Sequence, residues 1–250
     1  MRAWLDPLRA ALDEAPEPVT LFIRDDDAGW RDDRLVRMLD VLAARGVPVD
    51  VAAIPVEVGV WIAAELRGRA ESGLVGVHQH GYAHENHEAE GRRCEFGPSR
   101  SRGDQRHDIA AGRELLQAML GPTLQPWFTP PWNRCTAETG EVLVELGFTA
   151  LSRDRTAGRL GLPGLAELPI DVDWFATRRG RPLGREAVGA QLAAAVRAGG
   201  PVGLMLHHAE MDDAEMLALT GLIDLVGSHP HVRCRAMAAV LDTTPQEARA

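Results

Sequence analysis

Four of the nine histidines in this 250-residue chain, His78, His80, His84 and His87, lie within the stretch VGVHQHGYAHENHE. Neutral imidazole is a favoured metal ligand, and the four-residue spacing of His80 and His84 places two side chains on one face of a helical turn. One carboxylate would complete a two-histidine, one-carboxylate site with open positions for water and substrate. His78 shares a strand side with His80 and is either a second ligand or a group that orients one, whereas we expect His87 to be exposed.

Three consecutive carboxylates, Asp25, Asp26 and Asp27, follow the apolar run VTLFI in the segment RDDDAG. A run of like charges is often only a solvated loop. At the end of a strand, however, a carboxylate pair can divide two tasks, because one group binds a metal ion while the other stays free as a base. The position of this run after a strand favours the second interpretation.

Short apolar runs that alternate with longer helical patterns must position these residues. We expect strands at 19–23, 47–54, 73–78, 126–128, 148–152, 166–170, 201–206 and 232–234, and helices at 34–46, 59–70, 107–120, 137–147, 185–199 and 214–227, with a short helix at each end of the chain. Such alternation predicts right-handed βαβ units and a parallel sheet with enough strands for a barrel. A doubly wound open sheet is the alternative, but it usually has a glycine-rich loop where this chain has RDDDAG.

Polar clusters follow the ends of several expected strands. They are Asp25–Asp27, His78 with His80, the segment FTPPWN, the segment DVDW, and His207 with His208. In a parallel barrel the carboxyl ends of the strands share the face on which active sites are built. The sequence therefore predicts that these clusters meet in one cleft.

The composition narrows the class of protein. The formal charge of −9 argues against nucleic-acid binding, and the absence of lysine excludes Schiff-base and P-loop chemistry. We expect one domain over residues 1–250, no membrane span, and no disulfide among three widely spaced cysteines. The start of the chain does not look like a signal peptide, so we expect a cytoplasmic protein. The oligomeric state does not follow from the sequence.

The segments RDDDAG, HGYAH, FTPPWN, DVDW and LMLHH, in this order, resemble the motifs of polysaccharide deacetylases of the NodB-homology type, also called carbohydrate esterase family four. The resemblance spans roughly residues 22–208. It implies an α/β fold with a distorted (β/α)7-type barrel and one divalent metal ion, which we expect to be zinc. It also implies hydrolysis of an N-acetyl or O-acetyl group on a sugar or glycan precursor.

The resemblance also implies roles for individual residues. Asp27, His80 and His84 match the metal ligands. Asp26 matches the base, and Asp25 is a competing base because some relatives use an Asp-x-Asp arrangement.

The acid is expected on a later strand. His207 matches the general acid, and Asp171 or Asp173, of which we favour Asp173, matches the group that orients and charges it. On the substrate side we expect Trp132 as a wall for a sugar face, with Pro131 and His208 beside it.

The chain departs from the family pattern at three positions. Gly81 stands where a Ser or Thr often sits, and His208 stands where many members have Asp. Thr129 stands where the family commonly has the arginine that holds the base, so either Arg24, Arg100 or Arg134 replaces the missing charge or the base acts without it. The missing arginine leaves open a catalytically weak glycan-binding protein, and a metal-independent relative acting on a small cyclic amide is a further alternative. A non-haem iron oxygenase could use the same two-histidine, one-carboxylate set, but the barrel context disfavours it.

Overall fold

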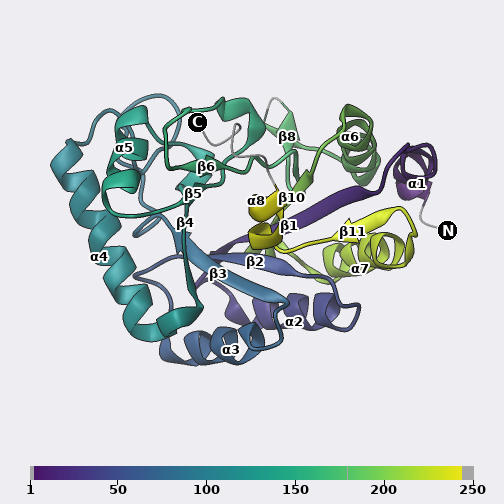
Figure 1. The fold of residues 1–250 in the computed structure, drawn as a ribbon, viewed down its shortest axis with the longest axis horizontal. Helices are drawn as coiled ribbons and strands as arrows, with labels where there is room; N and C mark the ends of the chain where they lie inside the picture. The colour runs from purple at the N-terminus through teal and green to yellow at the C-terminus, as the bar shows by residue number, and fades with distance from the viewer. Residues whose placement is uncertain (1–2, 179, 244–250) are drawn as a thin grey trace.

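The computed structural model describes residues 3–178 and 180–243, in which parallel strands and helices alternate along the chain as predicted (Figure 1). The main sheet has the order β6-β5-β4-β3-β2-β1-β10-β7, and β11 pairs with β1. Its strands are β1 (Val19–Ala28), β2 (Val49–Ala53), β3 (Val75–His80), β4 (Leu124–Thr129), β5 (Ala150–Leu151), β6 (Ala166–Glu167), β7 (Val172–Asp173), β10 (Val202–His207) and β11 (Val232–Cys234). All their ladders are parallel.

The sheet is curled into a half-barrel wrapped by helices, which confirms the predicted barrel-like α/β fold (Figure 1). Within the described residues no strand ladder joins β6 to β7, the two ends of the strand order, and each of these strands is only two residues long. The helices are α1 (Asp6–Asp13), α2 (Asp32–Ala43), α3 (Val60–Ala70), α4 (Arg102–Leu120), α5 (Ala137–Glu145), α6 (Arg185–Ala198), α7 (Asp213–Ser228) and α8 (Met237–Thr243).

The helices pack through apolar stripes of helical period. In α2 the buried residues are Leu35, Met38, Leu39 and Leu42, a spacing that forms a single face toward the sheet. None of the helices among the described residues combines the length and apolarity that a membrane crossing requires.

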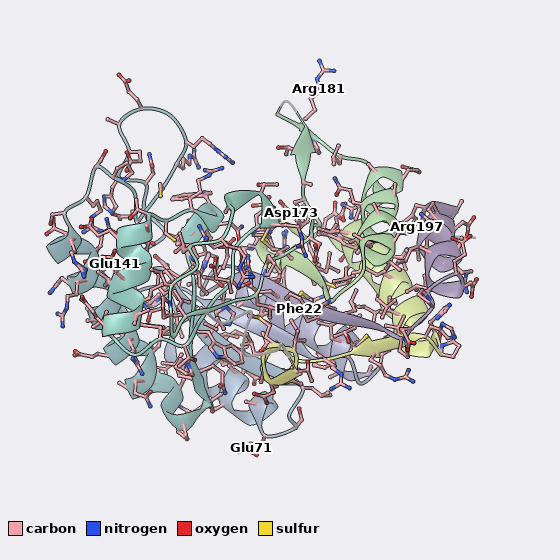
Figure 2. All side chains as sticks on the ribbon, turned by 45° about the horizontal axis from the view of Figure 1, so that its top comes forward. Phe22, Glu71, Glu141, Asp173, Arg181 and Arg197 are labelled. Atoms are coloured by element: carbon pink, nitrogen blue, oxygen red, sulfur yellow. The ribbon has the colours of Figure 1, made fainter. Side chains whose placement is uncertain are left out.

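Side chains alternate along β1 and separate two parts of the core. Leu21 and Ile23 belong to the large cluster shared with the helices, whereas Phe22 belongs to a second cluster that α8 covers. Figure 2 shows Phe22 near the centre of the molecule, beside α8. The same alternation continues into the polar end of β1, so it determines which way each functional side chain points.

The largest differences from the sequence prediction are two boundaries and one hairpin. β1 continues past Ile23 to Ala28, because its ladder with β10 extends to the pair Asp26 and His207. α4 begins at Arg102, where the Ser101 side chain accepts a hydrogen bond from the Asp104 backbone and so caps the helix. A small antiparallel hairpin, β8 (Thr177–Arg178) and β9 (Arg181–Pro182), was not expected.

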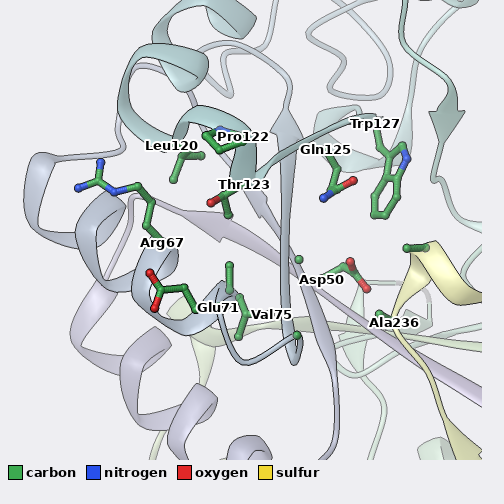
Figure 3. Close-up of a pocket in the computed structure, with 14 residues that line it drawn as sticks. Asp50, Arg67, Glu71, Val75, Leu120, Pro122, Thr123, Gln125, Trp127 and Ala236 are labelled. Carbon is green, nitrogen blue, oxygen red and sulfur yellow. The ribbon is translucent and has the colours of Figure 1, made fainter.

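A cavity of about 600 Å³ lies at the amino ends of β2, β3 and β4 (Figure 3). Asp50, Val75, Gln125 and Trp127 are among its lining residues, and Asp50 is almost fully buried. It therefore lies toward the opposite strand ends from the polar clusters that the sequence analysis identified.

Candidate active site

The three carboxylates at the end of β1 point in different directions. Asp26 continues the inner face of the strand with Phe22 and Arg24, whereas Asp25 continues the outer face toward the helices. Asp27 leaves this alternation because its backbone has a positive φ of 74° and the register with β2 shifts between Asp25 and Ala28. One run of three aspartates thus supplies three separate environments.

Asp27 converges with His80 and His84. Its Oδ1 atom lies 3.2 Å from Nε2 of His80 and 3.4 Å from Nε2 of His84, and the three candidate ligand atoms lie within 4.8 Å of one another. The same Oδ1 is buried and has no hydrogen-bond donor among the described residues. A buried oxygen that faces two imidazole nitrogens fits a divalent cation of the kind that takes one carboxylate and two histidines.

The two histidines are held in different ways. His80 ends β3, and its Nδ1 donates a hydrogen bond to the Thr129 carbonyl at 3.0 Å, which leaves Nε2 free to face Asp27. The ring of His84 lies between two tryptophans, with centroids 4.8 Å from Trp30 and 4.5 Å from Trp132. Trp30 had no recognisable signal in the sequence, because its role depends on a ring contact across the fold.

The charges around these ligands favour cation binding. Burial raises the pKa of Asp27, but the neighbouring histidines lower it by more, so the group is a carboxylate. Burial together with the nearby His80 lowers the pKa of His84 to about 4, which leaves its imidazole neutral at pH 7. Burial lowers the pKa of His80, but Asp27 and Asp26 raise it above its ordinary value, so metal binding would release a proton here.

Asp26 is paired with Arg24, two residues earlier on the same strand. Nε and Nη2 of Arg24 donate to the two carboxylate oxygens at 2.8 and 2.9 Å, and Arg24 is completely buried. Burial raises the pKa of Asp26, but Arg24, His80 and His207 together bring it below its ordinary value. Asp26 is therefore an ionised carboxylate held in a fixed geometry.

Arg24 is also the candidate that fills the place of the missing motif arginine. It donates further hydrogen bonds to Oγ of Ser152 and Oδ1 of Asn133, both at 2.7 Å. The two other candidates are engaged elsewhere, because Arg100 pairs with Asp108 and Arg134 donates to the Arg93 carbonyl.

Asp25 forms a separate buried pair with His208. Its oxygens accept the His208 backbone N–H at 3.0 Å and Nδ1 at 2.6 Å, while Nε2 of His208 donates to the Trp30 carbonyl at 2.7 Å. Burial lowers the pKa of His208, but Asp25 raises it to about 9, in agreement with two acceptors around one ring. The expectation that His208 lines the substrate cleft does not match this position, since the residue is completely buried.

His207 lies beside Asp173, at 3.9 Å between Nδ1 and Oδ1, and its side chain is 24% exposed. It is also the register partner of Asp26, so the two side chains share the inner face of the sheet. Asp171, the other candidate partner, instead accepts the Gly203 N–H at 2.8 Å and pairs with Arg155. Burial raises the pKa of Asp173, and the charge of His207 offsets only part of this effect.

The remaining candidates lie around the same strand ends. Trp132 is partly exposed, whereas Pro131 is buried against Gly81, which differs from its expected place in the substrate wall. His78 is not one of the three converging ligands. Its Nε2 lies 2.8 Å from Oγ1 of Thr129, and burial lowers its pKa to about 3. His87 is exposed, as expected.

Backbone strain is concentrated at this site. Five non-glycine residues of the described chain have a positive φ, and four of them, Asp27, His84, Trp132 and Asn133, belong to the site while the fifth, Arg31, follows Trp30. Such conformations cost free energy and persist only where the surrounding structure imposes them. Their clustering marks the carboxyl ends of β1, β3 and β4 as a functional region.

Comparison with known proteins supports the resemblance to polysaccharide deacetylases. The sequence matches the polysaccharide deacetylase family model over residues 14–151, whereas no curated protein shows significant similarity to it.

Solved structures share the fold at low sequence identity. A protein from Mycobacterium smegmatis assigned as a polysaccharide deacetylase is 18% identical, with 91% of each chain covered and a TM-score of 0.70. A family 4 acetyl xylan esterase from Clostridium thermocellum in complex with a cobalt ion is 18% identical, with 90% of this chain and 93% of that chain covered and a TM-score of 0.58. A family 4 pseudoenzyme from Bacillus anthracis is 15% identical, with 92% and 67% covered and a TM-score of 0.60. Because the family model spans more than half of its residues, the chain belongs to the polysaccharide deacetylase family.

Proposed function

We propose that this protein is a metal-dependent hydrolase that removes an acetyl group from a sugar or glycan precursor. The observation that carries the proposal is the convergence of Asp27, His80 and His84 beside an ionised Asp26. The cobalt ion in the esterase from Clostridium thermocellum supports a metal in this fold.

The ligand set defines what the metal would do. Oδ1 of Asp27 and the Nε2 atoms of His80 and His84 would hold one divalent ion, which we propose to be zinc. When bound, such an ion polarises an acyl carbonyl and makes a neighbouring water more acidic.

Asp26 would act as the base that accepts the proton of the attacking water. Its bidentate pair with Arg24 keeps it ionised and fixes its direction, so that the carboxylate is ready to accept a proton at neutral pH. Attack of the water on the acyl carbon gives a tetrahedral oxyanion.

His207 would act as the acid that protonates the leaving amine or alcohol. Its partial exposure lets it reach a substrate, and Asp173, 3.9 Å away, would orient the ring. Trp132, which is also partly exposed, would form a wall for the sugar ring. His208 and Pro131 are too deeply buried to take part in substrate contact.

One alternative has a specific observation in its favour. A pseudoenzyme from Bacillus anthracis shares the fold, and Thr129 occupies the place of the usual motif arginine, so a glycan-binding relative with little turnover is the second candidate. The Arg24–Asp26 pair favours the enzyme, because the charge that the motif arginine would supply is present from another position.

Metal content and acetate release measured together test the proposal. Purified protein should carry about one divalent ion per chain and release acetate from an acetylated sugar. Asp27→Asn and His84→Ala should lose both properties, while His87→Ala, which alters an exposed histidine of the same segment, should keep both. Full metal occupancy in the first two variants would exclude the site, and full turnover by metal-free protein would identify a metal-independent relative.

The acid role of His207 has its own test. An amine must be protonated as it leaves, whereas 4-nitrophenolate leaves unaided, so His207→Ala should reduce acetate release from an N-acetyl sugar by about 10²–10⁴-fold and spare most activity on 4-nitrophenyl acetate. Equal losses on both substrates would instead indicate damage to the metal site.

A further inference from the structure

Glu95 is a completely buried carboxylate in the long segment between β3 and α4. Its Oε1 accepts the backbone N–H of Ala83 at 2.7 Å and that of Glu85 at 3.5 Å, and its Oε2 accepts the N–H of Tyr82 at 3.2 Å. Three backbone donors therefore converge on one side chain that lies ten or more residues away in sequence. These donors surround His84, and we call residues 81–85 the His84 turn.

Gly81 shows that this arrangement is built into the shape of the turn. A Cβ atom at Gly81 would lie 2.1 Å from Oε2 of Glu95 and 2.6 Å from the ring of Pro131, and its φ is +57°. Any side chain at this position would thus occupy the space that the Glu95 carboxylate fills. The absence of a side chain at Gly81 thus makes room for the Glu95 carboxylate.

The orientation of His84 depends on this turn. His84 has a left-handed backbone with a φ of 56°, a conformation that needs support from its surroundings. His80, by contrast, belongs to β3 and is fixed by the ladder with β4. Of the two histidine ligands, His84 is therefore the one whose position depends on contacts outside a regular element.

We propose that Glu95 is a positioning residue for metal binding, which holds the His84 turn so that Nε2 of His84 faces Asp27. The inference rests on the proposed metal site, and Glu95 itself does not touch the ion. Groups that orient metal ligands typically change metal affinity by about 10–100-fold when they are altered.

The test compares two glutamates of the same segment by titrating the metal-free protein with Co²⁺. Glu95→Gln keeps the shape of the side chain but turns one acceptor into a donor that faces a backbone N–H, so the Kd for Co²⁺ should rise by about 10–100-fold. Glu88→Gln is the matched control. Glu88 accepts hydrogen bonds from the backbone and hydroxyl of Ser99, at 3.2 and 2.6 Å, and not from the His84 turn. Its substitution should therefore leave the Kd for Co²⁺ unchanged.

The visible absorption spectrum of bound Co²⁺ separates positioning from a general loss of stability, because it reports the ligand geometry. Glu95→Gln should alter this spectrum well below its Tm, whereas Glu88→Gln should not. If Glu95→Gln does not fold, Glu95→Asp, which keeps the charge but withdraws it from the turn, replaces it in the same comparison. A wild-type protein that binds no Co²⁺ would overturn the metal site itself. Wild-type affinity and spectrum in the folded Glu95 variant would overturn only the role of Glu95.

Discussion

Asp26 and Asp50 are buried carboxylates on neighbouring strands, yet their surroundings differ. Arg24 is the register partner of Asp50 across β1 and β2, but its guanidinium pairs with Asp26 instead. Asp50 receives one backbone N–H, from Met237 at 2.7 Å, and its other oxygen has no donor among the described residues. Burial raises the pKa of Asp50 to about 7, whereas the pKa of Asp26 lies below its ordinary value.

The difference shows that burial alone does not determine the charge of a carboxyl group. Asp50 caps the first residue of α8 and lies against Gly76, at the amino ends of the strands (Figure 3). Here the carboxyl group accepts a backbone hydrogen bond but has no cation beside it among the described residues. Asp50 therefore keeps its proton up to nearly neutral pH. At the carboxyl end Arg24 accompanies Asp26, and the charged form of Asp26 is favoured despite full burial.

The largest expected effect is on turnover. Asp26→Asn removes the base and should reduce acetate release by about 10²–10⁴-fold while metal stays bound, whereas Asp50→Asn should leave the rate unchanged. The measurement is acetate release with metal content determined on the same samples. If Asp25→Asn alone gives a metal-bound but inactive protein, Asp25 is the base and the role proposed for Asp26 is wrong.

The next effect is on stability. Arg24→Gln leaves the carboxylate of Asp26 buried without a cation and should lower the free energy of unfolding by about 3–5 kcal/mol in urea titrations. The double variant Arg24→Gln with Asp26→Asn should recover much of that loss, because neither charge remains.

An exposed ion pair provides the control for the Arg24 and Asp26 substitutions. Arg37 and Asp213 pair at 2.8 Å with side chains 60% and 87% exposed, so Arg37→Gln should cost about 0–1 kcal/mol. Strict additivity of the Arg24 and Asp26 substitutions would show that the two side chains are not coupled.

The last effect concerns the dependence of stability on pH. The folded protein holds the proton of Asp50 up to about pH 7, whereas the unfolded chain releases it near 3.8, so this group makes the protein less stable as the pH rises from about 4 to 7. The rise of about three units in the pKa of Asp50 corresponds to at most about 4 kcal/mol of unfolding free energy. Asp50→Asn removes this contribution, so its stability relative to wild type should increase over that range in urea titrations. A constant difference from pH 4 to pH 8 would show that Asp50 is ionised throughout.

Much of the fold could be predicted because its elements are periodic. The stripe of α2 and the strand around Val49–Ala53 follow directly from apolar spacing. The end of β1 could not be placed in this way, because three aspartates disfavour a strand by propensity. The structure extends the strand through them since each carboxylate meets a partner: Asp25 the ring of His208, Asp26 the guanidinium of Arg24, and Asp27 the two histidines.

The part of the site that depends on residue type and order along the chain could be predicted. The part that depends on long-range contacts could not. Asp27, His80 and His84 were identified together, and the structure brings them together. The alternation of side chains along a strand also accounts for the pairing of Arg24 with Asp26, because residues two apart on a strand share a face. Glu95 and Trp30 could not be found in this way, since their contacts with the His84 turn and ring cross the fold without any repeat in the sequence.

The placement of Arg24 makes the charge balance of Asp26 independent of the loops around the site. Arg24 and Asp26 lie on one strand inside a parallel sheet, so their spacing is fixed by the strand itself. The segment after β4 contributes only a neutral amide, Asn133, to the edge of this pair. Loss of the Asn133 side chain would therefore remove one hydrogen bond from Arg24 and leave the counter-charge of Asp26 in place.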